Sequence, residues 1–151
     1  MPRDPRMIAL GVLLLLAVVL GVTVVFTGPG ADLSETATVT ISVRVLDVPK
    51  IVSGQIAAGD PVSVDPAGMG IGTVTDVSVG PQYRSVSDAS GQLQSSPDPN
   101  SDEVIVTIES NGRQGGGVIA IENQVVQAGQ SFDIITPHVY LRGQILTVEV
   151  R

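Results

Sequence analysis

TATVTISVRVLD, residues 36–47, alternates between polar and apolar side chains almost without interruption. Val39, Ile41, Val43 and Val45 share one face, and threonine, serine and arginine side chains occupy the other. A period of two residues carried by β-branched side chains is typical of a strand that buries one face. The stretch therefore predicts a long, half-buried β-strand at the start of a β-rich domain.

The rest of the domain shows the same kind of pattern. Strands are predicted at residues 59–64, 71–79, 104–108, 131–136 and 140–150, with a turn at 65–68 and a hairpin over 118–126 that turns near Glu122–Gln124. No stretch after residue 30 shows helical periodicity, so we expect residues 36–151 to form an all-β domain.

Residues 81–102, PQYRSVSDASGQLQSSPDPNSD, interrupt this pattern. They contain few apolar side chains and many turn formers, and loops longer than about 12–15 residues are uncommon inside a compact domain. We therefore predict a mobile loop over residues 81–102 and expect it to contribute to any partner surface.

Two parts of the domain, residues 58–79 and 128–150, align with each other. Their shared positions pair Gly59 with Gly129, Val62 with Phe132, Val64 with Ile134, Gly72 with Gly143, Val74 with Ile145, Val77 with Val148 and Val79 with Val150. In both copies the alternation slips once at the same place, which is typical of a β-bulge. The repeat predicts two similar β units related by a pseudo-twofold axis.

Two such units can bury their apolar faces by closing on each other, which also removes open sheet edges. This predicts a small closed β-barrel, with a β-sandwich as the alternative. The Gly-Asp and Gly-Gln steps at Gly59 and Gly129 resemble the turn of cradle-loop barrels, in which the glycine bends the chain and the next polar side chain ties the backbone.

Residues 7–26, MIALGVLLLLAVVLGVTVVF, precede the domain and contain no charged side chain. At about 1.5 Å per residue, a helix of this length spans a hydrocarbon core of roughly 30 Å. Since only a helix satisfies its own backbone there, the segment predicts one transmembrane helix. The alternative, a cleaved signal peptide, is disfavoured by the length of the apolar run and by the lack of an A-x-A site after it.

Charges beside the apolar segment predict its orientation. Arg3 and Arg6 precede it, whereas Asp32 and Glu35 are the first charges after it. The positive-inside rule then places the N-terminus in the cytoplasm and the β domain outside the cell membrane. The expected organisation is a cytoplasmic leader (1–6), a transmembrane helix (7–26), a linker (27–35) and an extracytoplasmic β domain (36–151).

Composition excludes several kinds of site. The chain has no cysteine, so neither a disulfide nor a thiolate site is expected, and a formal net charge of −7 disfavours nucleic-acid partners. Aromatic residues make up only 3% of the chain, too few for base-stacking platforms.

One weak metal candidate stands out. Asp98, Asn100, Asp102 and Glu109 have the ligand spacing of a helix-flanked calcium loop. However, Glu103 occupies the position that requires glycine, and the second half of the motif is predicted as a strand. A solvated loop is therefore the favoured interpretation, and no cofactor is expected.

Catalytic signals are also weak. His138 is the only histidine; Asp133 and Tyr140 are near it in sequence, but no pattern places the three together, so a turn residue is favoured. Gly115–Gly117 lacks the lysine and following helix of a phosphate loop. The chain is therefore expected not to be an enzyme.

Several short motifs occur in a characteristic order. They are G-D-P-V at Gly59, I-G-T-V-T-D-V-S-V-G-P at 71–81, N-G near Asn111, A-G-Q-S-F at 128–132 and L-R-G-Q-I at 141–145. Together they resemble the bacterial and archaeal family named domain of unknown function 4330, over roughly residues 59–150. The resemblance implies one N-terminal transmembrane helix and a β domain, and it implies no activity.

We therefore expect a single-pass, membrane-anchored β domain that acts as an interaction or scaffolding module of the cell envelope, with the membrane and an envelope protein as partners. Two alternatives remain open. One is an extracytoplasmic binding domain for a small ligand, cation or glycan. The other is an accessory subunit of a membrane enzyme or transporter complex.

Overall fold

A computed structural model of the chain describes residues 35–63 and 70–151, which belong to one structural unit, Leu33–Arg151. The predicted leader (1–6), transmembrane helix (7–26), nearly all of the linker (27–35) and the turn at 65–68 lie outside the described residues. Within the described residues, no helix has the length and apolar character needed to cross a membrane.

The described elements are almost entirely strands. They are β1 (Glu35–Pro49), α2 (Lys50–Ser53), β2 (Pro61–Ser63), β3 (Gly70–Ser87), β4 (Leu93–Gly115), β5 (Val118–Ile121), β6 (Gln124–Val125), β7 (Ser131–Ile135) and β8 (Tyr140–Val150). The all-β prediction is confirmed, with the four-residue helix α2 inside a segment that sequence showed as irregular. The hairpin over 118–126 is also confirmed, because β5 pairs with β6 around Glu122 and Asn123.

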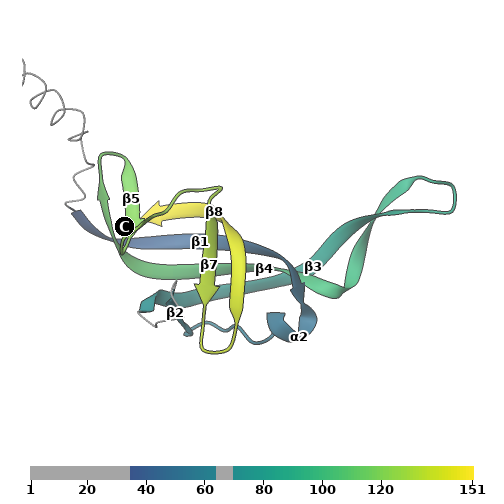
Figure 1. The fold of residues 1–151 in the computed structure, drawn as a ribbon, viewed down its shortest axis with the longest axis horizontal. Helices are drawn as coiled ribbons and strands as arrows, with labels where there is room; N and C mark the ends of the chain where they lie inside the picture. Colours follow the sequence, from purple (N-terminus) through teal and green to yellow (C-terminus); the bar gives the residue numbers. More distant parts are fainter. Residues whose placement is uncertain (1–34, 64–69) are drawn as a thin grey trace, which may run out of the picture. The chain divides into compact units, whose positions relative to one another are not determined.

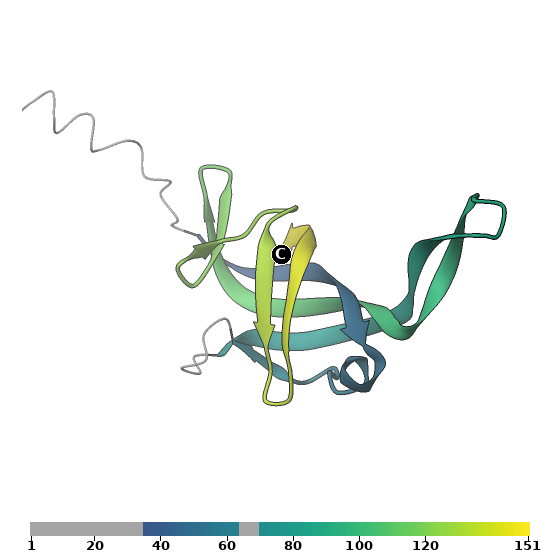
Figure 2. The ribbon, with the colours of Figure 1, turned by 45° about the vertical axis from the view of Figure 1, so that its right-hand side comes forward.

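The strands pair in a closed ring, all antiparallel. The order β1-β8-β7-β2-β3-β4 returns to its start because β1 also pairs with β4 (Figures 1 and 2). One pair, Ser63 with Ile135, joins β2 to β7, and the hairpin β5–β6 continues the sheet from β4. A single sheet that closes on itself agrees with the closed arrangement and not with a sandwich of two separate sheets.

Every strand of the ring contributes buried apolar side chains to one core. The innermost are Val39, Ile41, Val43, Val62, Val74, Val104, Val106, Ile108, Phe132, Ile134 and Ile145. They are apolar positions of the alternating segments, so the period-two pattern identified most of the buried side chains; Val79 of the predicted strand 71–79 is instead 49% exposed.

The pseudo-twofold axis passes through the ladder between β1 and β4. Ile41 pairs with Ile108 and Val43 with Val106, so exchanging the two strands reproduces the pairing. Ser42 and Thr107 pair at the centre, and their hydroxyl oxygens lie 3.5 Å apart. The two predicted units therefore meet through equivalent strands.

The two glycine turns also have the same backbone hydrogen bonds. Gly59 has φ +96° and Gly129 has φ +87°, a region that L side chains rarely adopt. The bonds are Gly59 N to Val74 O and Gly129 N to Ile145 O at 2.8 Å, and Val74 N to Asp60 O and Ile145 N to Gln130 O at 2.9 Å. The predicted side-chain tie is seen at Asp60, whose Oδ2 accepts from Ala57 N at 2.9 Å.

The predicted slip of the alternation is a β-bulge in both copies. On β3 the register shifts between Val74 and Asp76, so Thr75 is the extra residue. On β8 the partners of Ser42 and Val43 skip Leu146, which is the matching position of the second copy. The structure thus confirms the repeat alignment at the glycine turns and at the bulges, whereas Val64, which the alignment pairs with Ile134, lies outside the described residues.

The prediction of a loop without regular structure over residues 81–102 is wrong. These residues form the outer parts of β3 and β4, which pair from Tyr83 with Pro97 to Ser87 with Leu93. The strands were missed because this ribbon packs against no core. Its few apolar residues therefore do not show the alternation that identifies a half-buried strand. That the segment is mobile stays a prediction.

Candidate interaction surface

The outer parts of β3 and β4 form a two-stranded ribbon that projects beyond the ring (Figures 1 and 2). We call residues 83–97 the arm. Its side chains are largely exposed, including Tyr83 (58%), Val86 (48%) and Leu93 (77%). Apolar side chains at this exposure contribute little to the core. Other parts of the domain also expose large apolar side chains, among them Ile51 (78%) and Val79 (49%).

The arm lies beyond the part of β3 that takes part in the repeat. Val79 aligns with Val150 of β8, and β3 continues past Val79 to Ser87 before the chain returns along β4. The arm is therefore an extension of β3 and β4 outside the aligned segments.

An elbow joins the arm to the ring. Pro81 pairs with Asp102 and Tyr83 with Pro97, so the single residue Gln82 lies opposite residues 98–101 of β4. Asn100 N donates to Asp98 Oδ1 at 2.9 Å, which closes a tight turn within this bulge. Such a bulge redirects a ribbon relative to the sheet that it leaves.

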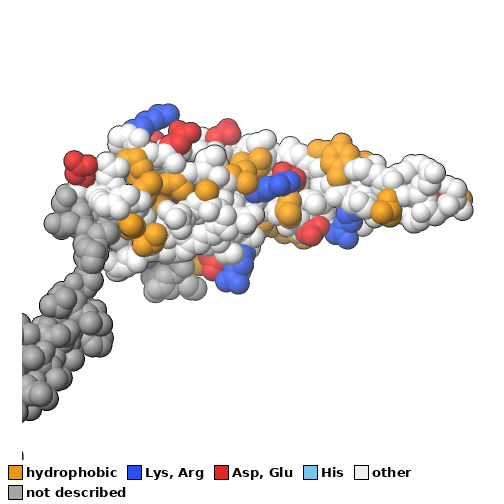
Figure 3. Space-filling model, turned by 90° about the horizontal axis from the view of Figure 1, so that it is seen from above, with side chains coloured by type: hydrophobic (Ala, Val, Ile, Leu, Met, Phe, Trp, Pro, Cys, Tyr) orange, Lys and Arg blue, Asp and Glu red, His pale blue; other side chains and the backbone are white. Residues whose placement is uncertain are grey.

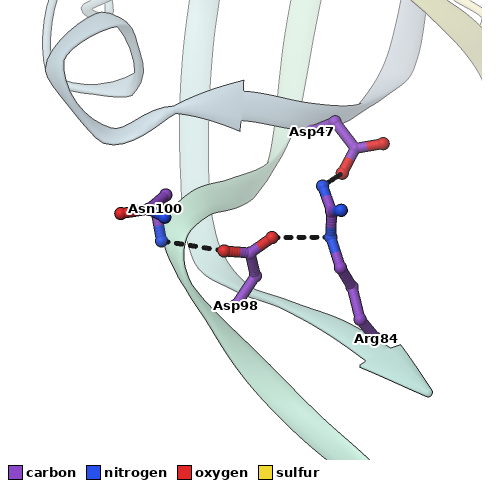
Figure 4. Close-up of polar contacts among 4 residues, drawn as sticks. All are labelled: Asp47, Arg84, Asp98 and Asn100. Atoms are coloured by element: carbon purple, nitrogen blue, oxygen red, sulfur yellow. Dashed lines mark hydrogen bonds and ion pairs between the residues drawn. The ribbon is translucent and has the colours of Figure 1, made fainter. Parts of the chain in front are cut away.

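Arg84 braces the elbow from the arm side (Figure 4). Its Nε lies 2.6 Å from Asp98 Oδ2 on β4, and its Nη2 lies 2.9 Å from Asp47 Oδ1 on β1. Asp98 is the enclosed member, with a side chain only 10% exposed. Asp47 has φ +57° within the bulge of β1 between Val45 and Val48. One guanidinium thus links the arm to two strands of the ring.

Two further contacts hold the ring side of the elbow. Ser53 Oγ of α2 donates to Asp102 Oδ2 at 2.7 Å, and Arg44 Nη2 of β1 lies 2.8 Å from Glu103 Oε2 of β4. The hydrogen bond and charge of Glu103 raise the pKa of Arg44 above its ordinary value. Together with Arg84, these contacts connect the root of the arm to β1 and α2.

Asp88 organises the tip of the arm. Its Oδ1 accepts from Ser90 Oγ at 2.6 Å and from Ser90 N and Gln92 N at 2.9 Å each, and its Oδ2 accepts from Gln94 Nε2 at 3.1 Å. The Ser90 hydroxyl, followed by the Gln92 amide, lowers the pKa of the Asp88 carboxyl. Gly91, with φ +83°, completes the turn.

Charge is sparse along the arm. Residues 83–97 contain one arginine and one aspartate, although the whole chain has a formal net charge of −7. Figure 3 shows the same contrast, with the arm at the right mostly uncharged and carrying apolar side chains. An exposed, neutral and partly apolar ribbon on an acidic protein is a candidate interaction surface.

The four calcium candidates do not come together. Asp98 contacts Arg84 and Asp102 contacts Ser53, whereas Asn100 is exposed. Glu109 lies farther along β4, roughly 20 Å from Asp102 at about 3.3 Å per residue. The described residues contain no group of three or more histidine, cysteine or acidic side chains placed to hold a metal ion.

His138 occupies the turn between β7 and β8, as expected. Its backbone N donates to Thr136 Oγ1 at 3.3 Å, and Val139 N donates to the same oxygen at 3.1 Å. Asp133 instead faces Arg142, with contacts of 2.6 Å and 2.9 Å, and this partner lowers the pKa of the Asp133 carboxyl. The structure therefore does not bring the histidine and the aspartate into one relay.

An open pocket of about 400 Å³ lies where β3, β4 and β1 meet near Thr38. Glu109 is the one charged residue among those that line it. The Ser110 hydroxyl, also in this pocket, donates to Ile71 O. The pocket thus offers the carboxylate of Glu109 beside the hydroxyl of Ser110, which already donates a hydrogen bond.

Comparison with protein families matches residues 7–149 to a domain of unknown function, DUF4330. The chain belongs to this family. The match is wider than the expected residues 59–150, and it includes the apolar segment 7–26 as well as the arm. No curated protein and no solved structure matches the chain in the other two comparisons.

Sequence reasoning named Asp98 but assigned it the wrong neighbours, and it missed Arg84 and Asp47. These three residues come from separate segments, so no local spacing joins them. One local signal of the arm was present. The turn-forming step Asp88-Ala89-Ser90-Gly91 lies between two stretches of similar length, which is typical of a hairpin.

Proposed function

We propose that this DUF4330 protein is a non-enzymatic, single-pass membrane protein whose extracytoplasmic β domain binds an envelope protein through the arm. The observation that carries the proposal is the arm itself. It extends β3 and β4 outside the repeat, adds no side chain to the buried core, and exposes Tyr83, Val86 and Leu93 on a braced ribbon. Exposed apolar residues on a positioned element are typical of binding surfaces.

The place of the arm in the domain supports this function. Glu35 pairs with Gln114 at one end of the β1–β4 ladder, and Pro49 pairs with Ser101 at the other end, beside the elbow. The 15 residues of β1 span roughly 45 Å between these ends. The arm thus leaves the domain at the end opposite Glu35, the last residue of the predicted linker.

Site-specific photocrosslinking in the native membrane tests the proposal. Tyr83 on the arm and Tyr140 on β8 are both tyrosines with 58% exposure, so each can be replaced by the same photoreactive phenylalanine analogue. We expect discrete crosslinked products from position 83 and none from position 140. Equal patterns at both positions, or no product from position 83, would contradict the arm as the binding element.

A cysteine label tests the proposed location. Because the chain has no cysteine, Ser90→Cys at the exposed tip of the arm gives a single reactive thiol. We expect a membrane-impermeant maleimide to label this variant in intact cells. Labelling only after lysis would refute the extracytoplasmic assignment.

The crosslinking experiment and a calcium titration separate the two alternatives. A crosslinked partner that is itself an enzyme or transporter subunit would favour the accessory-subunit function. A rise in melting temperature on adding calcium would favour a cation-binding domain, since a ligand that binds the folded state stabilises it.

A further inference from the structure

The arm has two edges, and the hydrogen-bond alternation shows which backbone groups point outward from it. Asp88 N donates to Gln92 O at the end of the ribbon. Hydrogen-bonded and non-hydrogen-bonded pairs alternate along an antiparallel ladder, and the residues of the second kind turn their N–H and C=O outward. These outward pairs are Ser87 with Leu93, Ser85 with Ser95, and Tyr83 with Pro97.

The two edges differ in what they offer a partner. On the β3 edge, Tyr83, Ser85 and Ser87 each present an N–H and a C=O. On the β4 edge, Pro97 has no N–H, and Pro99 follows within the elbow. Within the described residues, the arm section of each strand pairs only with the other, so both edges are open. On the β4 edge, Pro97 thus lacks an outward N–H, whereas Leu93 and Ser95 keep theirs; the β3 edge keeps all three of its outward N–H groups.

Charge indicates the occupant of this edge. The only charged side chain along Tyr83–Ser87 is Arg84, which Asp47 and Asp98 already engage. A second copy of the chain would bring another net charge of −7 close to the first, which electrostatic repulsion disfavours. An extended, uncharged segment meets no such repulsion and matches the neutral edge.

We infer that the β3 edge of the arm binds an extended, uncharged segment of a partner protein, which adds as a third strand to the ribbon. In this mode, backbone hydrogen bonds supply affinity and alternate side chains supply specificity. The inference rests on the proposed function, because it takes the arm as the binding element and specifies the edge and the chemistry of the partner.

A matched pair of proline variants tests the edge. Ser85 and Ser95 face each other across the ribbon, and both direct their N–H outward. Ser85→Pro removes a donor from the β3 edge, and Ser95→Pro removes one from the β4 edge; neither change removes a bond of the ribbon itself. The two variants thus make the same chemical change on opposite edges.

The probe is a phage-displayed library of random segments about ten residues long, selected on the full chain in lipid nanodiscs. An enriched segment is then synthesised with a fluorophore, and its affinity is measured by anisotropy. We expect enriched segments with few charges and alternating side chains. Binding should weaken about tenfold for Ser85→Pro, the loss of about one backbone hydrogen bond, and by less than about twofold for Ser95→Pro.

Three outcomes would overturn strand addition at this edge: no enriched segment, unchanged affinity for Ser85→Pro, or an equal loss for both variants. Sedimentation could also show that the unchanged chain forms dimers and that Ser85→Pro abolishes them. That result would overturn binding of a segment from another protein and favour a second copy of the chain at this edge. An unchanged yield of crosslinks from position 83 in Ser85→Pro would leave the proposed function intact while strand addition fails. No crosslink from position 83 in the otherwise unchanged chain would instead remove the proposed function.

Discussion

The ring and the arm are built from the same two strands under opposite constraints. Within the ring, β3 and β4 bury Val74, Val104, Val106 and Ile108 almost completely. Within the arm the same strands bury no large apolar side chain, and Arg84 and Asp88 make the main polar contacts. Burial of apolar side chains therefore stabilises the ring. The arm is held by polar contacts at its root and tip and by the backbone hydrogen bonds between its two strands.

The ring and the arm should therefore contribute differently to the stability and to the function of the molecule. Burying an aliphatic side chain contributes about 1.5–3 kcal/mol, whereas exposed ion pairs contribute about 0–1 kcal/mol. Substitutions in the ring should thus affect global unfolding, and substitutions in the arm should affect local order or binding. The following predictions test this separation.

The largest effect is expected at a glycine of β8 where the neighbouring strand leaves no room for a side chain. A Cβ added at Gly143 would lie 2.5 Å from Arg44 O and 2.7 Å from Val43 Cγ1. Gly143→Val should therefore lower the free energy of unfolding by about 3 kcal/mol, as measured by chemical denaturation. The exposed neighbour Gln144 supplies the control, and Gln144→Val should change stability far less. Similar losses for both would show that β8 does not pack as described.

The two glycine turns should give smaller and equal effects. Gly59→Ala and Gly129→Ala each place a side chain at positive φ, and nothing else lies within 4 Å of the added Cβ. Each should cost about 1–2 kcal/mol of unfolding free energy. The two turns have the same pattern of backbone hydrogen bonds. The two losses of unfolding free energy should therefore agree within about 0.5 kcal/mol. A clear difference would show that the halves are not energetically equivalent.

A smaller and local effect is expected at the brace. Arg84→Met removes both contacts of the guanidinium and should reduce hydrogen-exchange protection of arm amides, corresponding to less than about 1 kcal/mol. Arg142→Met is the matched control, since Arg142 also pairs with an aspartate on the surface but lies on β8. Protection of the arm should be unchanged in that variant. An equal loss in both would indicate that the brace has no specific role.

Sequence patterns predicted the ring well because its side chains face two different environments. Val39, Ile41 and Val43 alternate with polar neighbours, so the strand and its buried face follow from the period. The repeat carried further information, since the matched turns at Gly59 and Gly129 and the matched slip of alternation implied two equivalent units. Closure of β1 on β4 then follows from the symmetry of the ladder.

The same reasoning failed for the arm because both of its faces meet solvent. Ser85 and Ser95 pair across a ribbon in which polarity carries no information about strand direction or register. The brace was also hidden, because Asp47, Arg84 and Asp98 are brought together only by the bulge in β1 and the elbow. Local patterns identify burial, whereas ion pairs between distant segments depend on the folded geometry.

Lowering the pH should loosen the tip of the arm before it affects the ring. Hydrogen bonds from Ser90 and Gln92 lower the pKa of Asp88, so the folded tip favours the charged carboxylate. Its stabilisation is present above the ordinary aspartate range near pH 4 and is lost as the pH falls through the lowered pKa. Amide NMR signals of Ser90 and Gln92 should titrate there in the unchanged chain and not in Asp88→Asn. Titration in both would assign the transition to another group.

The smallest effect on global stability is expected from removing the arm altogether. Pro81 pairs with Asp102 at the root, so replacing residues 82–101 by Asn-Gly connects these partners through a two-residue hairpin turn. The replacement keeps the contact of Asp102 with Ser53 and removes the ribbon, the elbow with its Arg84 brace, and the pairing of Ser101 with Pro49. The unfolding free energy should change by less than about 1 kcal/mol, because the ring loses no buried apolar side chain. Chemical crosslinking of the shortened chain to the envelope partner, through groups outside the arm, should meanwhile disappear. A truncated chain that no longer folds would show that ring and arm form one cooperative unit, and the separation argued above would then fail.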